Sequence, residues 1–255
     1  MAKLAFITGA ASGLGQALAW RYHLAGAELA LVGRRPSVIK SWAEQRGISP
    51  DCYKIYSADV AVVASIVAAG EACLRQQGVP DVVAACAGIS IGVDTAERAD
   101  LDVMALTYAT NNVGTAATFM PFIKAMRQRR YGTLVGIGSV NGIRGLAGHG
   151  ASCASKAALI SYCESLRLEL RGSGVQVVTL CPGYVATPLT QGNRFGMPFL
   201  LQPQDFAERA YRAIEAGASY RAIPWRMGVV AKLLRLLPNP VFDRLFAGRQ
   251  RKARQ

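Results

Sequence analysis

Histidine is scarce in this sequence, which contains only two, His23 and His149. Its six cysteines are scattered and never form a C-x-x-C pair, so the usual ligands of a structural zinc site are missing and free thiols are expected. No apolar run approaches the roughly 18 residues of a membrane-spanning helix, and the chain begins with M-A-K rather than the apolar core of a signal peptide. These shortages predict a soluble, cytoplasmic protein without a metal centre.

Acidic residues are also few, 16 against 29 lysines and arginines, which leaves a formal net charge of +13. Such a charge favours anionic partners in general. The basic residues are nevertheless dispersed, apart from concentrations at 127–130 and 244–254, and they do not alternate with aromatic residues as a nucleic-acid platform requires. We therefore expect no nucleic-acid partner.

Short apolar segments of strand character alternate with helical patterns along the chain. They lie at 3–8, 28–32, 52–57, 81–85, 133–137, 175–180 and 219–223. The alternation predicts an α/β fold of the Rossmann type, a doubly wound parallel sheet of about seven strands with a ligand at its carboxyl edge. We expect a single domain over 1–224, followed by a basic amphipathic tail over 225–255. Asp59 is predicted to cap a helix at 61–77, and residues 111–114 to interrupt or bend a helix that starts near 97.

A glycine-rich loop, G-A-A-S-G-L-G at 9–15, stands between the first predicted strand and a helix. Glycines allow close backbone approach, so the helix N-terminus can meet a pyrophosphate. The second strand ends in Gly33-Arg34-Arg35, without the acid that usually meets an adenosine 2′-hydroxyl. Arginine suits a 2′-phosphate instead, which favours NADP(H) over NAD(H). Arg35 has an alternative to phosphate binding, namely a solvent-exposed position before the helix that follows.

Several further motifs agree in order and spacing over residues 3 to about 223, and together they resemble the short-chain dehydrogenase/reductase family. They are T-G-x-x-x-G-x-G from Thr8, Asp59-Val60, Asn111-x-x-Gly114, Ser139, Cys153-Ala154-Ser155-Lys156, Pro182-Gly183 and Thr187. The resemblance implies an NADP-dependent interconversion of a carbonyl and an alcohol. It also implies a homodimer or homotetramer built on helices near 111–130 and 151–171. The implied cofactor-binding residues are Thr8, Gly9, Ser12, Gly13, Leu14, Gly15, Arg34, Arg35, Asp59, Val60, Ala87, Gly88, Lys156, Pro182, Gly183, Val185 and Thr187.

The resemblance also implies the catalytic residues, Asn111, Ser139, Ser152 and Lys156. In the family a tyrosine acts as the acid, the lysine lowers its pKa and binds the nicotinamide ribose, the serine bonds the carbonyl, and the asparagine holds a relay water. Two positions depart from the pattern. Residues 85–88 read A-C-A-G where many members have N-N-A-G, and Ser152 stands where the family has its catalytic tyrosine.

Ser152 bears directly on activity, because an aliphatic hydroxyl is a far weaker acid than a phenol and its side chain is shorter. One explanation is that the serine replaces a tyrosine of an active parent enzyme. A second is a member that has lost activity and binds cofactor in a regulatory or scaffold role. A third is that His149 or Tyr184 supplies the proton, although we expect His149 to be a solvated loop residue and Tyr184 to pack against substrate or cofactor. A serine–lysine hydrolase pair is also conceivable, but no nucleophile elbow accompanies it.

Two segments bear on the substrate. Residues 187–202, with Phe195, Met197, Phe199 and Leu200, are predicted to form a lid over an apolar pocket, which suggests a hydrophobic ketone or alcohol as substrate. In the tail, apolar residues between 229 and 237 are predicted to form one helix face with Lys232 and Arg235 opposite. This helix is expected to pack on a neighbouring subunit or over the cleft; the alternative is peripheral contact with the inner face of an anionic membrane.

Overall fold

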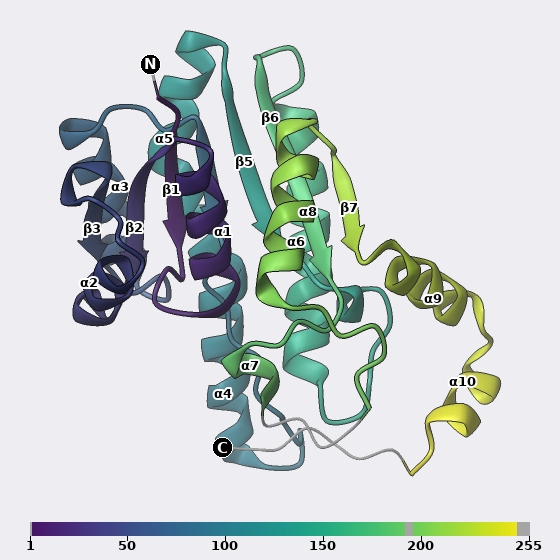
Figure 1. The fold of residues 1–255 in the computed structure, drawn as a ribbon. Helices are drawn as coiled ribbons and strands as arrows, with labels where there is room; N and C mark the ends of the chain where they lie inside the picture. Colours follow the sequence, from purple (N-terminus) through teal and green to yellow (C-terminus); the bar gives the residue numbers. More distant parts are fainter. Residues whose placement is uncertain (1, 192–195, 249–255) are drawn as a thin grey trace.

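The computed structural model describes residues 2–191 and 196–248 (Figure 1). Its centre is a seven-stranded sheet in which the neighbours run in the order β3-β2-β1-β4-β5-β6-β7. The strands are β1 (Leu4–Thr8), β2 (Glu28–Gly33), β3 (Tyr53–Ser57), β4 (Val82–Ala85), β5 (Gly132–Ile137), β6 (Val175–Pro182) and β7 (Tyr220–Ile223). Every pairing between these strands is parallel. The predicted Rossmann-type sheet is therefore confirmed.

Helices cover both faces of the sheet, as a parallel sheet requires. One face carries α1 (Gly13–Leu24), α2 (Pro36–Gln45) and α8 (Pro203–Glu215), and the other carries α3 (Val63–Gln76), α5 (Gly114–Arg129) and α6 (Gly150–Glu169). The helices α4 (Arg98–Tyr108) and α7 (Pro188–Gln191) lie beyond the carboxyl ends of the strands, and α9 (Trp225–Leu236) and α10 (Asn239–Phe246) follow β7 (Figure 1).

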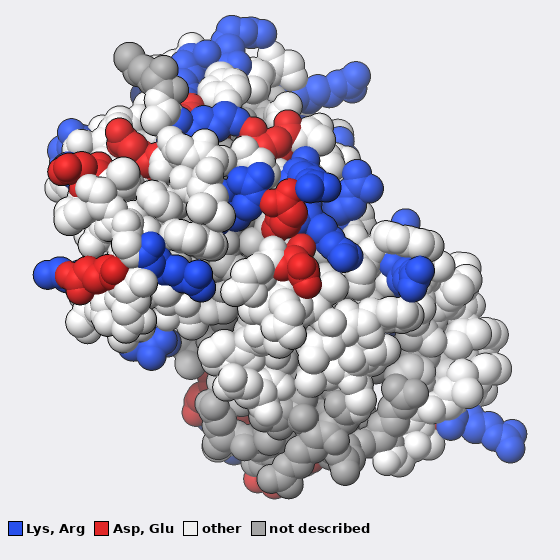
Figure 2. All heavy atoms as spheres, in the orientation of Figure 1, with Lys and Arg blue, Asp and Glu red and all other residues white. Residues whose placement is uncertain are grey.

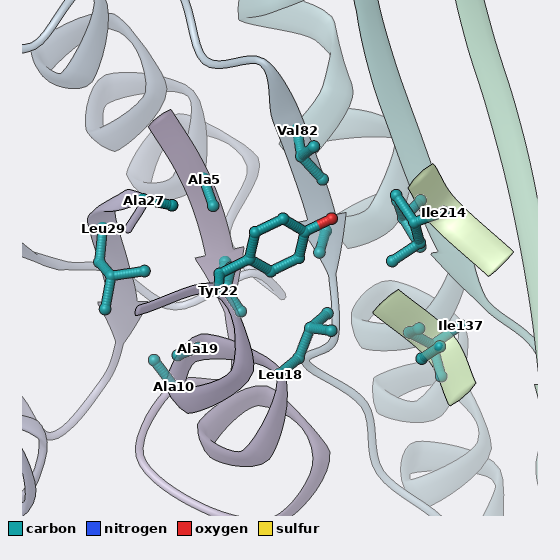
Figure 3. Close-up of a cluster of buried hydrophobic side chains, with 14 of the residues drawn as sticks. Ala5, Ala10, Leu18, Ala19, Tyr22, Ala27, Leu29, Val82, Ile137 and Ile214 are labelled. Atoms are coloured by element: carbon teal, nitrogen blue, oxygen red, sulfur yellow. The ribbon is translucent and has the colours of Figure 1, made fainter. Parts of the chain in front are cut away.

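The core on the α1 side is centred on Tyr22, whose ring lies among Ala5, Leu18 and Val82 (Figure 3). Tyr22 is completely buried, and its hydroxyl donates to Glu215 Oε1 at 3.4 Å. Burial is the main cause that raises the pKa of this phenol, so Tyr22 stays neutral and serves packing rather than acid chemistry. Packing of this kind holds α1, and with it the glycine-rich loop, against the sheet.

Two local predictions have different outcomes. The helix α3 begins at Val63 with Val62 as its N-cap, so the predicted start near 61 and the Asp59 cap are wrong. The Asp59 carboxylate accepts instead from Ala61 N at 3.0 Å, the turn that aspartate forms with its own backbone two residues on. The predicted interruption near 111 is confirmed, because a π-helical turn, Ala109–Val113, separates α4 from α5.

The tail helix α9 does not bury the predicted apolar face. Its buried residues are Met227, Gly228 and Ala231, whereas Val229 and Leu233 are exposed. A Cβ atom on Gly228 would lie 2.5 Å from Ala222 Cβ, so the helix approaches β7 too closely for large side chains. Close approach therefore requires glycine at position 228, while Val229 and Leu233 stay outside the contact.

Candidate active site

Two adjoining cavities lie at the carboxyl edge of the sheet, where the strand order reverses between β1 and β4. The first, of about 630 Å³, is lined by Gly9, Ser12, Arg34, Arg35, Asp59, Val60, Ala87 and Gly88 among others. The second, of about 210 Å³, is here called the catalytic cavity. Of the predicted residues it is lined by Gly9, Ser12, Gly13, Leu14, Gly15, Ala87, Gly88, Ser139, Ser152, Lys156, Pro182, Gly183, Val185 and Thr187. Thr8 and Asn111 lie behind these walls and not in them.

The glycine loop fits a dinucleotide. Gly9 has a φ of +69°, and a Cβ atom there would lie 2.9 Å from Ala87 N. A Cβ atom on Gly15 would lie 2.4 Å from Gly9 O, so neither position tolerates a side chain. Thr8 Oγ1 accepts from Ala87 N at 3.1 Å and holds the two strand ends together. This packing brings the N-terminus of α1 to the cavity, where its first N–H groups are available to an anionic group.

Arg34 and Arg35 follow β2 at the far end of the first cavity. The Arg34 side chain is 71% exposed, and its Nη1 lies 3.7 Å from Asp59 Oδ2 across the cavity. At this distance and exposure the pair contributes little to stability. Arg34 is therefore free to turn toward a ligand phosphate at modest cost.

Asn111 fixes the shape of the catalytic cavity from behind. The π-helical turn points its buried amide at the segment after β4, where Asn111 Oδ1 accepts from Ile89 N at 2.9 Å and Nδ2 donates to Ile89 O at 3.0 Å. Nδ2 also donates to Ser155 Oγ of α6 at 3.0 Å. Both amide N–H groups are thus committed to protein acceptors. The side chain links two walls of the cavity, and the relay-water role stays a prediction.

Lys156 reaches the cavity from the second turn of α6. Its Nζ donates to Ile137 O at the end of β5 at 2.6 Å. Burial lowers the pKa of this ammonium to about 8, because the charged form loses its hydration. At neutral pH the Lys156 side chain therefore remains mostly protonated, but it loses its proton as the pH rises past about 8.

Two hydroxyl groups stand in the same cavity. Ser152 is buried, and its Oγ accepts a hydrogen bond from Ser90 Oγ at 2.9 Å. Ser139 Oγ accepts from Asn141 N at 3.1 Å and donates to Pro182 O at 3.5 Å, a weak bond that a substrate oxygen can replace. The hydroxyl of Ser152 is thus engaged by Ser90, and the ammonium of Lys156 by Ile137 O. This arrangement does not activate Ser152 as the nucleophile of a serine–lysine hydrolase.

Two further cavity residues depart from the sequence predictions. His149 is only 6% exposed and lines the catalytic cavity, so the expectation of a solvated loop residue is wrong. The reason is that α6 begins at Gly150, which makes His149 its N-cap one turn before Ser152. Ser90 was not predicted at all; its position shortly after the small-residue turn that ends β4 is the one signal that pointed to it. Tyr184 also lines this cavity.

The predicted lid is described only in part. Phe195 lies outside the described residues. Phe199 and Leu200 are 45% and 43% exposed, and Leu201 pairs with Val185 in an isolated β-bridge. Because Val185 lines the catalytic cavity, this bridge holds the C-terminal end of the 187–202 segment beside it. Pro188, Leu189 and Thr190, at the other end of the segment, line the cavity too. The lid role of the segment stays a prediction.

Comparison with known proteins agrees with this geometry. The family described as short chain dehydrogenase matches residues 3–196. An uncharacterized oxidoreductase of Myxococcus xanthus is 36% identical over 241 residues, which cover 94% of this chain and 95% of that protein. A 3-ketoacyl-(acyl-carrier-protein) reductase of Brucella melitensis, solved with NADH, shares 27% identity at a TM-score of 0.77, covering 86% of this chain and 95% of that one. A short-chain dehydrogenase/reductase of Burkholderia phymatum, solved with NAD, has a TM-score of 0.83 at 23% identity over 91% and 92% of the two chains, which shows the fold alone. The chain therefore belongs to the short-chain dehydrogenase family of oxidoreductases.

Proposed function

We propose that this protein interconverts a ketone and a secondary alcohol on a hydrophobic small molecule, with NADP(H) as its cofactor. The proposal is supported chiefly by the two adjoining cavities. The catalytic cavity holds Ser139 and Lys156, and the first cavity, which fits a dinucleotide, holds the two arginines. The two solved relatives named above hold NADH and NAD. The preference for NADP(H) therefore rests on Arg34 and Arg35 alone.

In this reaction a bound nicotinamide supplies or accepts the hydride at the carbonyl carbon. The Ser139 hydroxyl would donate to the carbonyl oxygen, on which negative charge grows in the reductive direction. The Lys156 ammonium adds a positive charge in a cavity where charges are poorly screened. Ser152 cannot act as the family's tyrosine does, so we expect slow turnover by this chain.

The wall of the catalytic cavity suggests the substrate class. Apolar side chains of Leu14, Ile89, Val140, Val185 and Leu189 line it around the two serine hydroxyls. Apolar walls with a few convergent polar groups are typical of sites for small hydrophobic ligands. The Brucella relative is named for a ketone substrate, a 3-ketoacyl group, which is consistent with carbonyl chemistry.

Replacing Arg34 with aspartate should test the cofactor assignment. The variant removes a phosphate partner and adds a like charge, so we expect the Kd for NADPH to rise about tenfold or more, the equivalent of roughly 1.4 kcal/mol, while binding of NADH is unchanged or tighter. Nicotinamide fluorescence would measure both constants. Arg209→Asp, on the exposed side of α8, makes the same charge change away from the cavities. Equal losses for NADPH in the two variants would remove the assignment.

An alternative function is favoured by Ser152, namely a member that binds the cofactor without turnover and acts as a regulator or scaffold. The two functions differ in one measurement. Binding of NADPH without reduction of any compound in a panel of hydrophobic ketones, also after Ser152→Tyr, would favour the binding protein.

We also propose that the protein is a cytoplasmic homodimer or homotetramer. The outward side of α6 carries the small residues Ala154, Ala157 and Ala158, all exposed. Exposed apolar side chains nearby along the chain, Val113 at 51% and Met120 at 54%, would add apolar area to such a contact. Helix pairs of this kind are suited to a symmetric contact.

The tail supports a further proposal, peripheral contact with an anionic lipid surface. Large exposed apolar residues recur three or four positions apart along α9, and two more lie four positions apart on α10. This α9–α10 stripe consists of Trp225, Val229, Leu233, Leu236, Val241 and Leu245, each at least 46% exposed. Figure 2 shows few charged side chains over this part of the molecule. Arg226, Lys232, Arg235 and Arg244 flank the stripe, and Asp243 is the single acid after Trp225. Among the described residues, none of the helices has the length and apolar character that crossing a membrane requires, so the contact would lie at the surface.

Co-sedimentation with vesicles tests the lipid contact. The chain should sediment with vesicles that contain phosphatidylglycerol and much less with pure phosphatidylcholine, because the flanking cations add about 1 kcal/mol each at an anionic surface. The double change Leu233→Glu and Leu236→Glu should abolish binding. Leu24→Glu, equally exposed at the end of α1, should not. If the double variant changes the mass in solution instead, the stripe is covered by a second copy of the chain.

A further inference from the structure

We propose that His149 supplies the proton to the substrate oxygen in this chain. The proposal rests on the reductase function above. It names the residue that donates the proton in place of the tyrosine that Ser152 replaces. His149 is buried, it is titratable, and it lines the catalytic cavity. Neither the proposed binding of the cofactor nor the contacts of Lys156 involve it.

The placement of His149 follows from the helix. His149, Ser152 and Lys156 are spaced i, i+3 and i+7, so they share one side of α6 and its N-terminal extension. All three line the same cavity of about 210 Å³, together with Ser139. A substrate oxygen held by Ser139 would thus share this cavity with the imidazole, which would reach it directly or through one water.

The backbone around His149 is held from both sides. His149 O accepts from Cys153 N at 2.8 Å and His149 N donates to Leu146 O at 3.1 Å. The preceding residue, Gly148, has a φ of +73° and accepts through its carbonyl from Val93 N at 3.1 Å. These contacts fix the imidazole-bearing residue between α6 and the segment that leads to α4. A position fixed in this way suits a catalytic group.

The other groups in the cavity are poorer acids near neutral pH. Ser139 and Ser152 are aliphatic alcohols, and Ser152 is already engaged by Ser90. The Lys156 ammonium donates one hydrogen bond to Ile137 O, and its pKa of about 8 makes it a weaker acid than an imidazolium. Tyr184 has a phenol, but its side chain packs against the α9 contact of Val140, Met227 and Ala231. Imidazole has an unperturbed pKa of about 6.5, which makes it the side chain best matched to proton transfer at physiological pH.

The step balances as follows. A hydride reaches the carbonyl carbon, the electron pair of the carbonyl bond moves to the oxygen, and that oxygen takes a proton from the imidazolium of His149. The substrate gains two electrons and the nicotinamide loses them. The neutral imidazole regains its proton from water.

The charge around His149 comes from several elements. Lys156 and the positive N-terminal end of α6 disfavour the imidazolium. The segment packed on Gly148 carries Asp94 and Asp100, which favour it, and Asp100 Oδ2 accepts from Asp94 N at 2.6 Å. The remaining titratable groups in the cavity wall are Cys86 and Tyr184, and burial raises the pKa of the Cys86 thiol to about 12, so it stays neutral. Because the proton donor is the imidazolium, the fall of kcat with rising pH should therefore begin with the loss of the His149 proton.

The change His149→Gln tests the proposal in two backgrounds. In the present chain we expect kcat for NADPH-linked ketone reduction to fall at least about tenfold, with loss of the titration that follows imidazole, since a positioned acid contributes about 10² to 10⁴-fold. In a Ser152→Tyr chain, where a phenol supplies the proton, the same change should cost less than about threefold. His23→Gln is the matched control, because His23 lies at the far end of α1 beside Trp20.

A readout without turnover comes from the imidazoles themselves. Because the chain has two histidines, NMR of the imidazole nitrogens gives only two pairs of signals to assign, one pair for each ring. NADP⁺ should shift the titration of His149 and leave that of His23 unchanged. Equal loss of kcat in both backgrounds would mean a structural role for His149, and full kcat after His149→Gln with a loss after Tyr184→Phe would make Tyr184 the donor; either overturns the proposal. No reduction by any form, including Ser152→Tyr, would instead remove the reductase function.

Discussion

Replacing Lys156 with methionine should lower kcat/KM for NADPH-linked ketone reduction by about 10³-fold, within the range for removing a preorganised charge beside the reacting oxygen. Methionine keeps most of the length of the lysine and fills the same buried space, so the fold should survive. The bond from Nζ to Ile137 O and the charge in the catalytic cavity are lost together. Nicotinamide absorbance at 340 nm would follow the rate. A decrease below threefold would mean that Lys156 serves packing alone.

The same variant reveals the buried ammonium through pH. Lys156 has a pKa near 8 in the folded chain against a reference value of 10.5, so the unfolded state binds more protons between these pH values. The free energy of unfolding of the parent chain should therefore rise relative to Lys156→Met as pH increases from about 8 to 10.5. Activity should move in the opposite direction: beyond the decrease that follows loss of the His149 proton, it should fall further above about pH 8 as the ammonium is lost. Urea unfolding at several pH values, compared between the two chains, would measure the first effect.

The change Ser152→Tyr should raise kcat for ketone reduction about 10²-fold, the lower end of the contribution of a positioned general acid, because His149 already supplies part of it. Ser152 points into the catalytic cavity, which leaves room for a ring in front of it. Lys156 one turn further along α6 would lower the pKa of the new phenol. The rate at saturating NADPH and ketone is the measurement.

The matched control for this gain is Ser152→Phe, which adds the ring without the hydroxyl. It should give no increase, and it should bind NADPH as the tyrosine variant does. An equal gain in both variants would mean that filling the cavity, and not an acid, limits the rate. Equal rates for the serine and tyrosine forms would contradict the expectation that this chain is weakened by Ser152.

The strands were predictable because their physics is local. Apolar runs such as 133–137 must be buried on both faces of a parallel sheet, and turn residues bound them, so the predicted ends lie within about two residues of those observed. The lengths of the loops and the side on which a residue falls are less local. Asp59 had two acceptable uses, a helix cap or a turn with its own backbone, and the sequence did not distinguish them.

His149 and α9 show what the pattern could not provide. The burial of His149 depends on where α6 begins and on Val93, which is far away in the sequence. In α9 the apolar periodicity was real, but the packing distance to β7 selected Gly228 and Ala231 for the contact. In both cases a tertiary contact decides which residues are buried, and the local sequence pattern does not contain that contact.

The position of α9 has a consequence for how selectivity can evolve. Met227 and Ala231 pack against Val140 and Tyr184, which also line the catalytic cavity, and Arg144 ties the loop beside them to the carbonyls of Arg235 and Leu237. The family model ends at residue 196, before α9, whereas the Myxococcus relative matches 94% of the chain and therefore shares part of this segment. We therefore expect that exchange of residues 225–246 between relatives alters the catalytic cavity at Val140 and Tyr184 and leaves the glycine loop unchanged. A change in α9 would therefore alter the wall of the catalytic cavity without touching the residues that line the first cavity.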